Sequence, residues 1–327
     1  MQRTSWIIRD RFRADALQPA AWERLAAIIG IVALGASALV WELTEPVEIH
    51  GADILAMAGP SDNSRATGTT SPAPGASTRA GTEILAGAYF GTSHTHPSTV
   101  TIKNPDRTDM TVRDFQWEGK PFKSPIYYGA RAVAWLDNAR VGAMLDFTHA
   151  KAIARFDDIG TFTGTHEGKP LPSKARVGNV FKHLEFSHGH NMLTVNALTR
   201  LGRFAVQPYV GAGAGISLPH TEVAFRTENG RTYEYQYAGL VGQALAGVEV
   251  KLGRATVFLE YKFTYAPYEV PLSGVVNGWL LVTDVWRQLT AWASGEIPPA
   301  GRLSTTLITH HAVGGVLVRA TPAMAGR

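Results

Sequence analysis

The chain contains no cysteine among its 327 residues. This absence excludes disulfides, zinc–thiolate sites, iron–sulfur clusters and thiol nucleophiles together. Any metal ion that the protein binds must therefore be held by histidine, carboxylate or backbone oxygen.

Charged residues are also scarce, at 18% of the chain, whereas hydrophobic residues make up 45%. Beyond the N-terminal region, no run is long and apolar enough to predict a membrane-spanning helix. The apolar residues are dispersed in short segments among 33 glycines, which favours many strands over buried helices. The formal charge of +4 comes from scattered basic residues, so we expect phosphorylated lipid rather than nucleic acid as the partner.

The N-terminal region has the composition of an export segment. Several arginines precede an apolar run from Ala26 to Trp41, and Ala36-Ser37-Ala38 offers a cleavage site. The charged part is unusually long for a signal peptide, so an uncleaved anchor is the alternative. A Ser/Thr/Pro/Gly-rich stretch follows, with the composition of a flexible linker. We therefore predict an export signal or signal anchor at 1–59, the linker at 60–82, the folded domain at 83–318 and a disordered tail at 319–327.

Eight segments of the folded domain alternate apolar and polar residues with the period of a strand. Most have the length that a tilted strand needs to cross a bilayer. The eight segments are Glu83–Phe90, Ile126–Leu136, Val141–Ala150, Met192–Leu201, Val206–Leu218, Leu240–Leu252, Thr256–Tyr265 and Thr306–Val318.

Short and long connections take turns between these segments. Tight turns at Asp137-Asn138, Gly202-Arg203 and Gly253-Arg254 alternate with long connections. Outer-membrane barrels have this layout, with short periplasmic turns and long outer loops. We therefore predict an all-β fold, an eight-stranded antiparallel up-and-down outer-membrane β-barrel of a Gram-negative bacterium, with long extracellular loops, one short loop helix and a site that faces the cell exterior. The expected long loops are 91–125, 151–191, 219–239 and 266–305.

The alternation gives each strand an apolar face and a mixed one. If the apolar faces meet lipid, polar side chains fill a narrow lumen and pair with one another. A soluble, lipocalin-like barrel would reverse the two faces, and periodicity alone does not orient them. Aromatic residues near the segment ends, as in the girdles of membrane barrels, favour the first arrangement. The expected lumen residues are Arg131, Asp146, Asn196, Gln243, Glu249, Glu260 and Lys262.

Histidines gather in the expected outer loops and the adjoining strand ends. Two H-x-H pairs, His94 with His96 and His188 with His190, place both rings on one side of an extended chain. His183 precedes the second pair. Imidazole with carboxylate suits iron, manganese, copper or zinc. We therefore take these five histidines as candidate metal ligands, while ordinary surface histidines and contacts to lipid phosphate remain the alternative.

Other polar residues near the same rim are candidates for proton transfer. We select Glu185, Glu222 and His149 as candidate catalytic residues, and His220 should lie nearby. His310 and His311 are adjacent in the last segment, so one must point inward, where it could reach the rim. The remaining loop carboxylates could serve in general acid or base work, although solvated loop charge is the favoured interpretation for each. These carboxylates are Glu234, Glu269 and Asp284.

The fourth long connection contains the expected helix, within Gly278 to Trp292. Leu281, Val285, Leu289 and Trp292 form an apolar stripe at helical spacing. The tryptophans suit a helix at the lipid headgroup level, although packing against the barrel top would explain them as well.

Several runs together resemble the lipid A oxidases of rhizobial outer membranes. The resemblance spans Glu83 to Val318 and is most specific in the run from His183 to Met192. It implies oxygen-dependent conversion of the proximal glucosamine of 1-dephosphorylated lipid A to 2-aminogluconate, with hydrogen peroxide as the second product and a divalent metal as cofactor. It assigns no ligands, so the site residues rest on the histidine pattern. The runs begin at Ser93, Pro121, His183, Pro208, Phe258 and Gly278.

We therefore expect an oxidoreductase that uses O2 and a divalent metal of the Fe, Mn or Cu class. No flavin or NAD is expected, because no dinucleotide fingerprint lies between a strand and a helix. The expected partners are lipid A and outer-membrane lipid, and we expect a monomer. One alternative is a lipid A hydrolase or deacylase that pairs Ser187 with His188 or His190. The other is a non-catalytic binding or structural barrel.

Overall fold

A computed structural model describes residues 82–320, apart from 106 and 137–139. The predicted export segment, almost all of the predicted linker, the Asp137-Asn138 turn and the tail from residue 321 onward lie outside the described residues. The first strand begins at Glu83, as predicted, and the last ends at Arg319, one residue beyond the predicted end.

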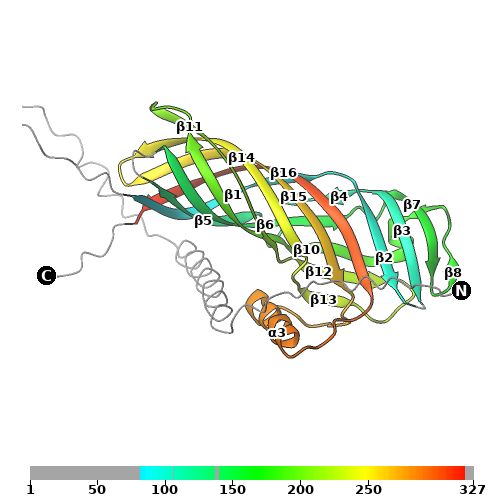
Figure 1. Cartoon of the computed structure of the whole chain (residues 1–327). Helices are drawn as coiled ribbons and strands as arrows, with labels where there is room; N and C mark the ends of the chain where they lie inside the picture. The colour runs from blue at the N-terminus through cyan, green and yellow to red at the C-terminus, as the bar shows by residue number, and fades with distance from the viewer. Residues whose placement is uncertain (1–81, 106, 137–139, 321–327) are drawn as a thin grey trace, which may run out of the picture. The chain divides into compact units, whose positions relative to one another are not determined.

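Eight antiparallel strands form a closed ring in chain order (Figure 1). Every strand pairs with its neighbours in sequence, and the last strand closes the ring by pairing with the first through eleven residue pairs from Leu85↔Arg319 to Thr95↔Thr309. The prediction of eight strands is confirmed. The ring consists of β1 (Glu83–Thr95), β5 (Tyr128–Trp135), β6 (Val141–Ala154), β10 (Phe181–Arg200), β11 (Val206–Ser217), β14 (Gly239–Leu252), β15 (Ala255–Pro271) and β16 (Arg302–Arg319).

The lumen of the ring holds a network of buried ion pairs. Arg131 lies between two carboxylates, with its Nε 3.1 Å from Asp146 Oδ1 and its Nη2 2.7 Å from Glu260 Oε1. Lys262 Nζ lies 2.7 Å from Asp146 Oδ2, so two cations balance two anions. Buried charges are tolerated when each is paired in this way. The predicted polar lumen is confirmed.

The outer wall of the ring is apolar. Val195 of β10 and Leu259 of β15 expose 62% and 66% of their surface, and their chain neighbours point inward. This arrangement is the reverse of a soluble, lipocalin-like barrel and matches a lipid-facing wall. Large exposed side chains on this wall are Ile84, Phe90, Val141, Val195, Leu240, Leu259 and Val316.

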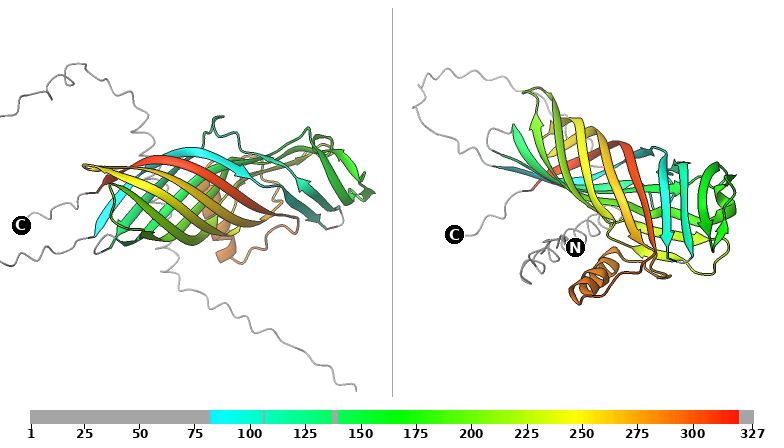
Figure 2. Two further views of the ribbon diagram at one scale, coloured as in Figure 1. Left: turned by 90° about the horizontal axis from the view of Figure 1, so that it is seen from above. Right: turned by 45° about the vertical axis from the view of Figure 1, so that its right-hand side comes forward.

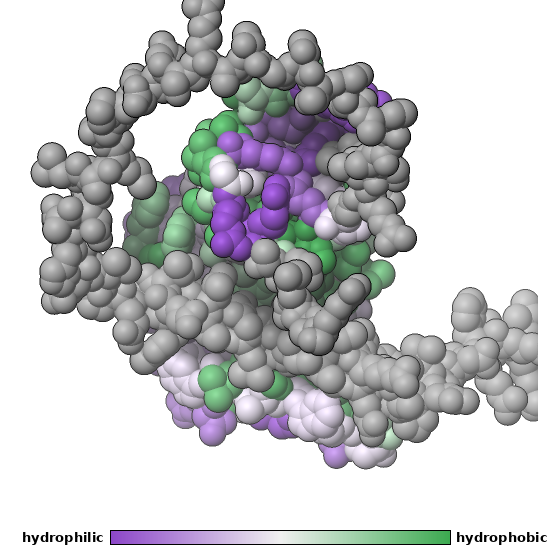
Figure 3. All heavy atoms as spheres, turned by 90° about the vertical axis from the view of Figure 1, so that its left-hand side faces the viewer, coloured by the Kyte–Doolittle hydropathy of each residue, from purple (hydrophilic) through white to green (hydrophobic). Residues whose placement is uncertain are grey.

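A cluster of ion pairs around Glu83 lies at one end of the ring, which we call the turn end. Glu83 lies 2.7 Å from Lys251 Nζ and 2.6 Å from Arg319 Nη2, and Arg200 approaches the same carboxylate at 3.6 Å. Figure 3 faces this end and shows hydrophilic residues gathered beside hydrophobic ones. We call the opposite end of the ring the loop end.

The long connections at the loop end contain strands, which corrects the expectation of irregular loops. Several ring strands continue past the ring and gain new partners there, because their outer ends would otherwise leave backbone groups unpaired. The sheet extends from β16 through β2, β3 and β7, while a hairpin of β12 and β13 adds to β10 (Figures 1 and 2). The added strands are β2 (Ser98–Asn104), β3 (Thr108–Phe115), β4 (Trp117–Glu118), β7 (Ile159–His166), β8 (Lys169–Pro170), β9 (Lys174–Arg176), β12 (His220–Phe225) and β13 (Thr232–Tyr235).

A second core, made mainly of apolar side chains, fills the space between these extensions. Phe115, Phe181 and Phe186 are fully buried there, beside Leu303 and Leu307 of β16. Aromatic rings of this size contribute much of the apolar area that a core removes from water. The loop end is therefore a packed layer, and many residues that were expected in loops lie on strands.

Two helices lie within the described residues, α2 (Val177–Val180) and α3 (Leu281–Ala293). Neither is long and apolar enough to cross a membrane. The predicted loop helix is confirmed as α3, which lies outside the sheets beside the loop end (Figures 1 and 2). Val285 of the predicted stripe is buried, whereas Trp286 and Trp292 are exposed.

Candidate functional site

The candidate site lies on the outer face of β10, where this strand passes from the ring into its extension. Leu184 and Phe186 point into the apolar core, so the alternation directs His183 and Glu185 outward. The register of β10 against β6 shifts between Phe186 and His190. Such a bulge re-aims the side chains around it. Within it, Gly189 adopts a φ of +142°, which side chains rarely permit.

Three of the predicted residues meet on this face. Glu185 of β10 and Glu222 of β12 are register partners. The Nδ1 of His183 lies 3.0 Å from Glu185 Oε1 and 3.5 Å from Glu222 Oε1. One ligand atom from each residue lies within 4.8 Å of the others. One imidazole nitrogen and two carboxylates form a donor set that suits a divalent metal ion.

Glu222 is the more buried carboxylate of the pair. Burial raises its pKa, and the nearby charge of Glu185 adds to this effect, while His183 and Arg231 oppose it. Arg231 Nη1 lies 3.2 Å from Glu222 Oε1. Two acids and one arginine thus share a partly desolvated site, where a second cation would relieve the remaining excess of negative charge.

Aromatic side chains form a wall beside these three residues. The rings of His188 and His220 lie 4.8 Å apart, and Tyr233 stands 4.4 Å from His220 between ring centres. Trp279, just before α3, completes the wall at 5.0 Å from Tyr233 and 5.8 Å from His188. Arg231 lies over the Tyr233 ring at 4.2 Å, joining the wall to the carboxylates. Flat aromatic surface of this kind suits the apolar face of a sugar ring.

His220 presents a free nitrogen in this wall. Its Nε2 lies 3.0 Å from the Gly278 carbonyl and must be the protonated donor there. Its Nδ1 therefore carries a lone pair, and this buried atom has no hydrogen-bond partner among the described residues. Burial lowers the pKa of His220 to about 4, against the opposing effect of the Gly278 carbonyl. The ring is therefore neutral at pH 7.

His149 lies near this wall, but in a position of its own. Its ring stacks on Tyr128 at 4.6 Å, and its Nδ1 lies 2.8 Å from Asn191 Oδ1. Because Asn191 donates its amide to the Leu218 carbonyl, His149 donates from Nδ1. Its buried Nε2 has no hydrogen-bond partner among the described residues. Among the described residues, His149 makes no hydrogen bond or ring contact with His183, Glu185 or Glu222.

The structure separates the remaining candidate ligands from the His183 group. His190 is fully buried and hydrogen-bonds through Nδ1 to Tyr268, which belongs to the apolar core. It therefore lies on the inner face of the sheet. His94 and His96 lie on β1, on another part of the ring wall, and meet His310 instead. The expectation that His188 and His190 point to the same side and could hold one metal ion is wrong, because the bulge between Phe186 and His190 turns His190 inward while His188 stays in the aromatic wall.

The other loop carboxylates anchor α3. Asp284 accepts a hydrogen bond from the backbone N–H of Tyr235 at 3.2 Å. Glu234 pairs with Arg287 of the helix. Glu269 is exposed and lies 3.7 Å from Arg302. Asp284 and Glu234 are both buried and have a structural role, so the interpretation as solvated loop charge is wrong for these two. It is confirmed for the exposed Glu269.

Sequence reasoning missed Arg231 and Tyr233. Both lie in or beside β13, which pairs with β12 so that Tyr233 stands opposite Glu222. The segment from His220 to Tyr235 was interpreted as one loop. Its alternation on either side of the turn at Glu228–Gly230 was the signal for a hairpin that would have brought these residues to Glu222.

No family model matches the chain, and no curated protein matches it. Among solved structures, the outer membrane protease OmpT from Escherichia coli is similar over 73% of this chain and 97% of its own. The sequence identity is 7% and the TM-score is 0.36. A likeness of this size has no bearing on the residues of the site.

Proposed function

We propose that this protein is an outer-membrane enzyme that oxidises the proximal glucosamine of 1-dephosphorylated lipid A to 2-aminogluconate. The observation that carries the proposal is the group of His183, Glu185 and Glu222 on the outer wall, ten residues along β10 from the exposed Val195. A lipid in the outer leaflet would place its acyl chains against the apolar wall and its sugar near this group. The resemblance to lipid A oxidases supplies the reaction.

The donors of this site fit a divalent metal cofactor. Two carboxylates and one imidazole nitrogen suit iron or manganese, and the outward face of the sheet leaves coordination positions open. His183, Glu185 and Glu222 would hold the ion. When bound, a redox-active ion would supply the electron-transfer chemistry between sugar and dioxygen.

The side chains around the site would accept a proton from the sugar and bind its ring. The anomeric hydroxyl must lose a proton, and the Nδ1 of His220, which has no hydrogen-bond partner among the described residues, would be the acceptor. Trp279 and Tyr233 offer flat surface for the sugar ring. Oxidation of the hemiacetal at C1 gives a lactone while dioxygen is reduced to hydrogen peroxide, and water then opens the lactone to the acid. The net change in the lipid is the gain of one oxygen atom.

The proposal is tested with full-length protein in detergent and 1-dephosphorylated lipid A. Product mass is compared in air, under anaerobic conditions and after chelation. We expect a one-oxygen gain in mass, with equimolar hydrogen peroxide, only in air and only with metal. Glu222→Gln should abolish it, whereas Glu118→Gln, an exposed carboxylate on the same face of the sheet, should not. A full yield under anaerobic conditions would refute the proposal.

A deacylase is the second candidate, because Ser187 Oγ lies 3.3 Å from His188 Nδ1. Such an enzyme would use the serine as nucleophile and the histidine as base. Ser187→Ala separates the two reactions. We expect this variant to retain oxidation, whereas loss of an acyl chain that requires Ser187 and not oxygen would favour the deacylase. An unchanged lipid under every condition would favour a binding or structural barrel.

A further inference from the structure

The two adjacent histidines of β16 point to opposite sides of the wall. His311 is fully buried in the lumen, where Tyr127 and Thr264 contact its ring nitrogens. His310 therefore points outward. It is the register partner of His94 on β1. Sequence reasoning expected the inward histidine to reach the rim site, whereas the structure gives the outward one two histidine neighbours.

We propose that His96, His310 and His94 form a second metal site, which takes a nitrogen-preferring divalent ion such as Zn²⁺ or Cu²⁺. The Nε2 atoms of His96 and His310 lie 2.7 Å apart. Two nitrogens bound to one tetrahedral zinc ion are separated by about 3.3 Å, so small side-chain movements would admit the ion. The ring of His94 lies 5.3 Å from that of His96. His94 is exposed, and rotation of its side chain brings a third nitrogen to the site.

The surroundings of His310 match those of a metal ligand. Its Nδ1 is hydrogen-bonded to the Tyr261 hydroxyl. A ligating histidine usually donates its second ring N–H to a neighbouring acceptor, which fixes the tautomer and directs the other nitrogen at the ion. Tyr261 has this position, and His310 Nε2 is left facing His96. A simple contact between two surface histidines would not need such support.

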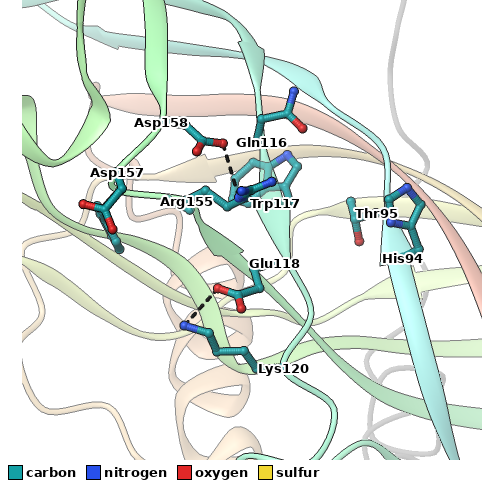
Figure 4. Close-up of a pocket in the computed structure, with 11 residues that line it drawn as sticks. His94, Thr95, Gln116, Trp117, Glu118, Lys120, Arg155, Asp157 and Asp158 are labelled. Carbon is teal, nitrogen blue, oxygen red and sulfur yellow. Dashed lines mark ion pairs between the residues drawn. The ribbon is translucent and has the colours of Figure 1, made fainter.

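The site has access to a polar cleft. A cavity of about 560 Å³ is lined by His94 together with charged residues of β4 and the segment after β6 (Figure 4). Glu118 and Lys120 form an ion pair of 2.9 Å there, and Arg155 pairs with Asp158 at 3.2 Å. A metal ion held by three histidines keeps a fourth position open for a small ligand that enters from the cleft.

The donor sets of the two sites predict different metals. The His183 group offers one nitrogen and carboxylate oxygens, whereas the His310 group offers nitrogen only. Imidazole sets favour copper, nickel and zinc over manganese. The inference does not depend on the proposed oxidase reaction, because the two groups lie on different strands and share no residue.

Metal binding to the full-length protein in detergent tests the inference. After chelation, the protein is titrated with Cu²⁺ and with Zn²⁺, bound ions are counted by mass spectrometry, and Cu²⁺ is examined by electron paramagnetic resonance. We expect His310→Ala to bind one equivalent less than the wild type and to lose a Cu²⁺ signal with coupling to several nitrogens. His96→Ala should behave in the same way, and its exposed position spares the fold.

Two controls separate this site from the other. Thr92→Ala alters an exposed residue on the same face of β1 as His94. It should change neither the number of bound ions nor the multi-nitrogen Cu²⁺ signal. Glu222→Gln removes a ligand of the His183 group and should preserve the multi-nitrogen Cu²⁺ signal. If the signal disappears in Glu222→Gln, or if His96→Ala binds as many ions as the wild type, the second site does not exist.

Discussion

Glu185 of β10 and Glu222 of β12 stand directly opposite each other in the sheet, so both carboxylates leave it on the same face. Like charges at such a position repel one another. His183 and Arg231 offset part of this repulsion, at 3.5 Å and 3.2 Å from Glu222. A cation bound between the two carboxylates would offset the rest of the repulsion.

Glu222→Gln is expected to weaken the binding of Mn²⁺ or Fe²⁺ at least tenfold, because the amide is a neutral and poorer ligand. Burial raises the pKa of Glu222, so protons should compete with metal at a higher pH than for an ordinary glutamate. Affinity of the wild type should therefore fall as the pH is lowered toward 5. Calorimetric titration of the chelated protein at several pH values measures both effects, with Glu118→Gln as the matched control. Equal affinities of the Glu222→Gln variant and the wild type would exclude Glu222 as a ligand.

His220 should make the stability of the protein pH-dependent. Burial lowers its pKa in the folded state to about 4, so between pH 4 and about 6.5 the unfolded chain binds more protons than the folded one. The free energy of unfolding should therefore fall as the pH drops through this window, by a total on the order of 3 kcal/mol. Urea unfolding in detergent at several pH values measures the slope.

The same unfolding measurement on His220→Gln should give a flatter slope, because glutamine does not titrate. His96→Gln replaces an exposed histidine and should keep the slope of the wild type. An identical slope in His220→Gln and wild type would show that His220 does not contribute to the pH dependence of the free energy of unfolding.

Arg131→Leu should lower the free energy of unfolding by about 3–5 kcal/mol, because it leaves Glu260 buried without its partner. The double variant Arg131→Leu, Glu260→Leu removes both charges and should recover part of the loss. Urea unfolding in detergent gives both values. A double variant less stable than the single one would show that packing, and not the unpaired charge, sets the cost.

Trp286 should contact lipid, because it exposes 53% of its surface on α3 beside the apolar wall. In bilayers with brominated acyl chains, which quench nearby tryptophans, Trp286→Phe should lower the quenched fraction of the fluorescence. Trp117→Phe removes a buried tryptophan from the apolar core of the loop end and should raise that fraction, because the quenched signal is unchanged while the total fluorescence falls. The opposite pattern would place α3 away from the membrane.

Most strands of the ring could be predicted from the sequence, because the alternation of apolar and polar residues that identifies a strand is a local pattern. Alternation along Val141–Thr148 and Val257–Thr264 identified two strands and their faces, and the buried ion pairs of Arg131 and Lys262 followed from those faces. The outer ends of the strands were missed. Their pattern changes at the loop end, where the inner face meets an apolar core in place of the polar lumen.

The sequence by itself determined that eight alternating strands form an antiparallel ring and that its histidines gather at one end. Periodicity and connection length carry that information, but they leave open which face of the strands lines the lumen. Only the tertiary structure decided which histidines meet. His183 joins Glu222, His190 turns into the core, and His96 joins His310, because pairing register and a single bulge in β10 select neighbours that are far apart along the chain.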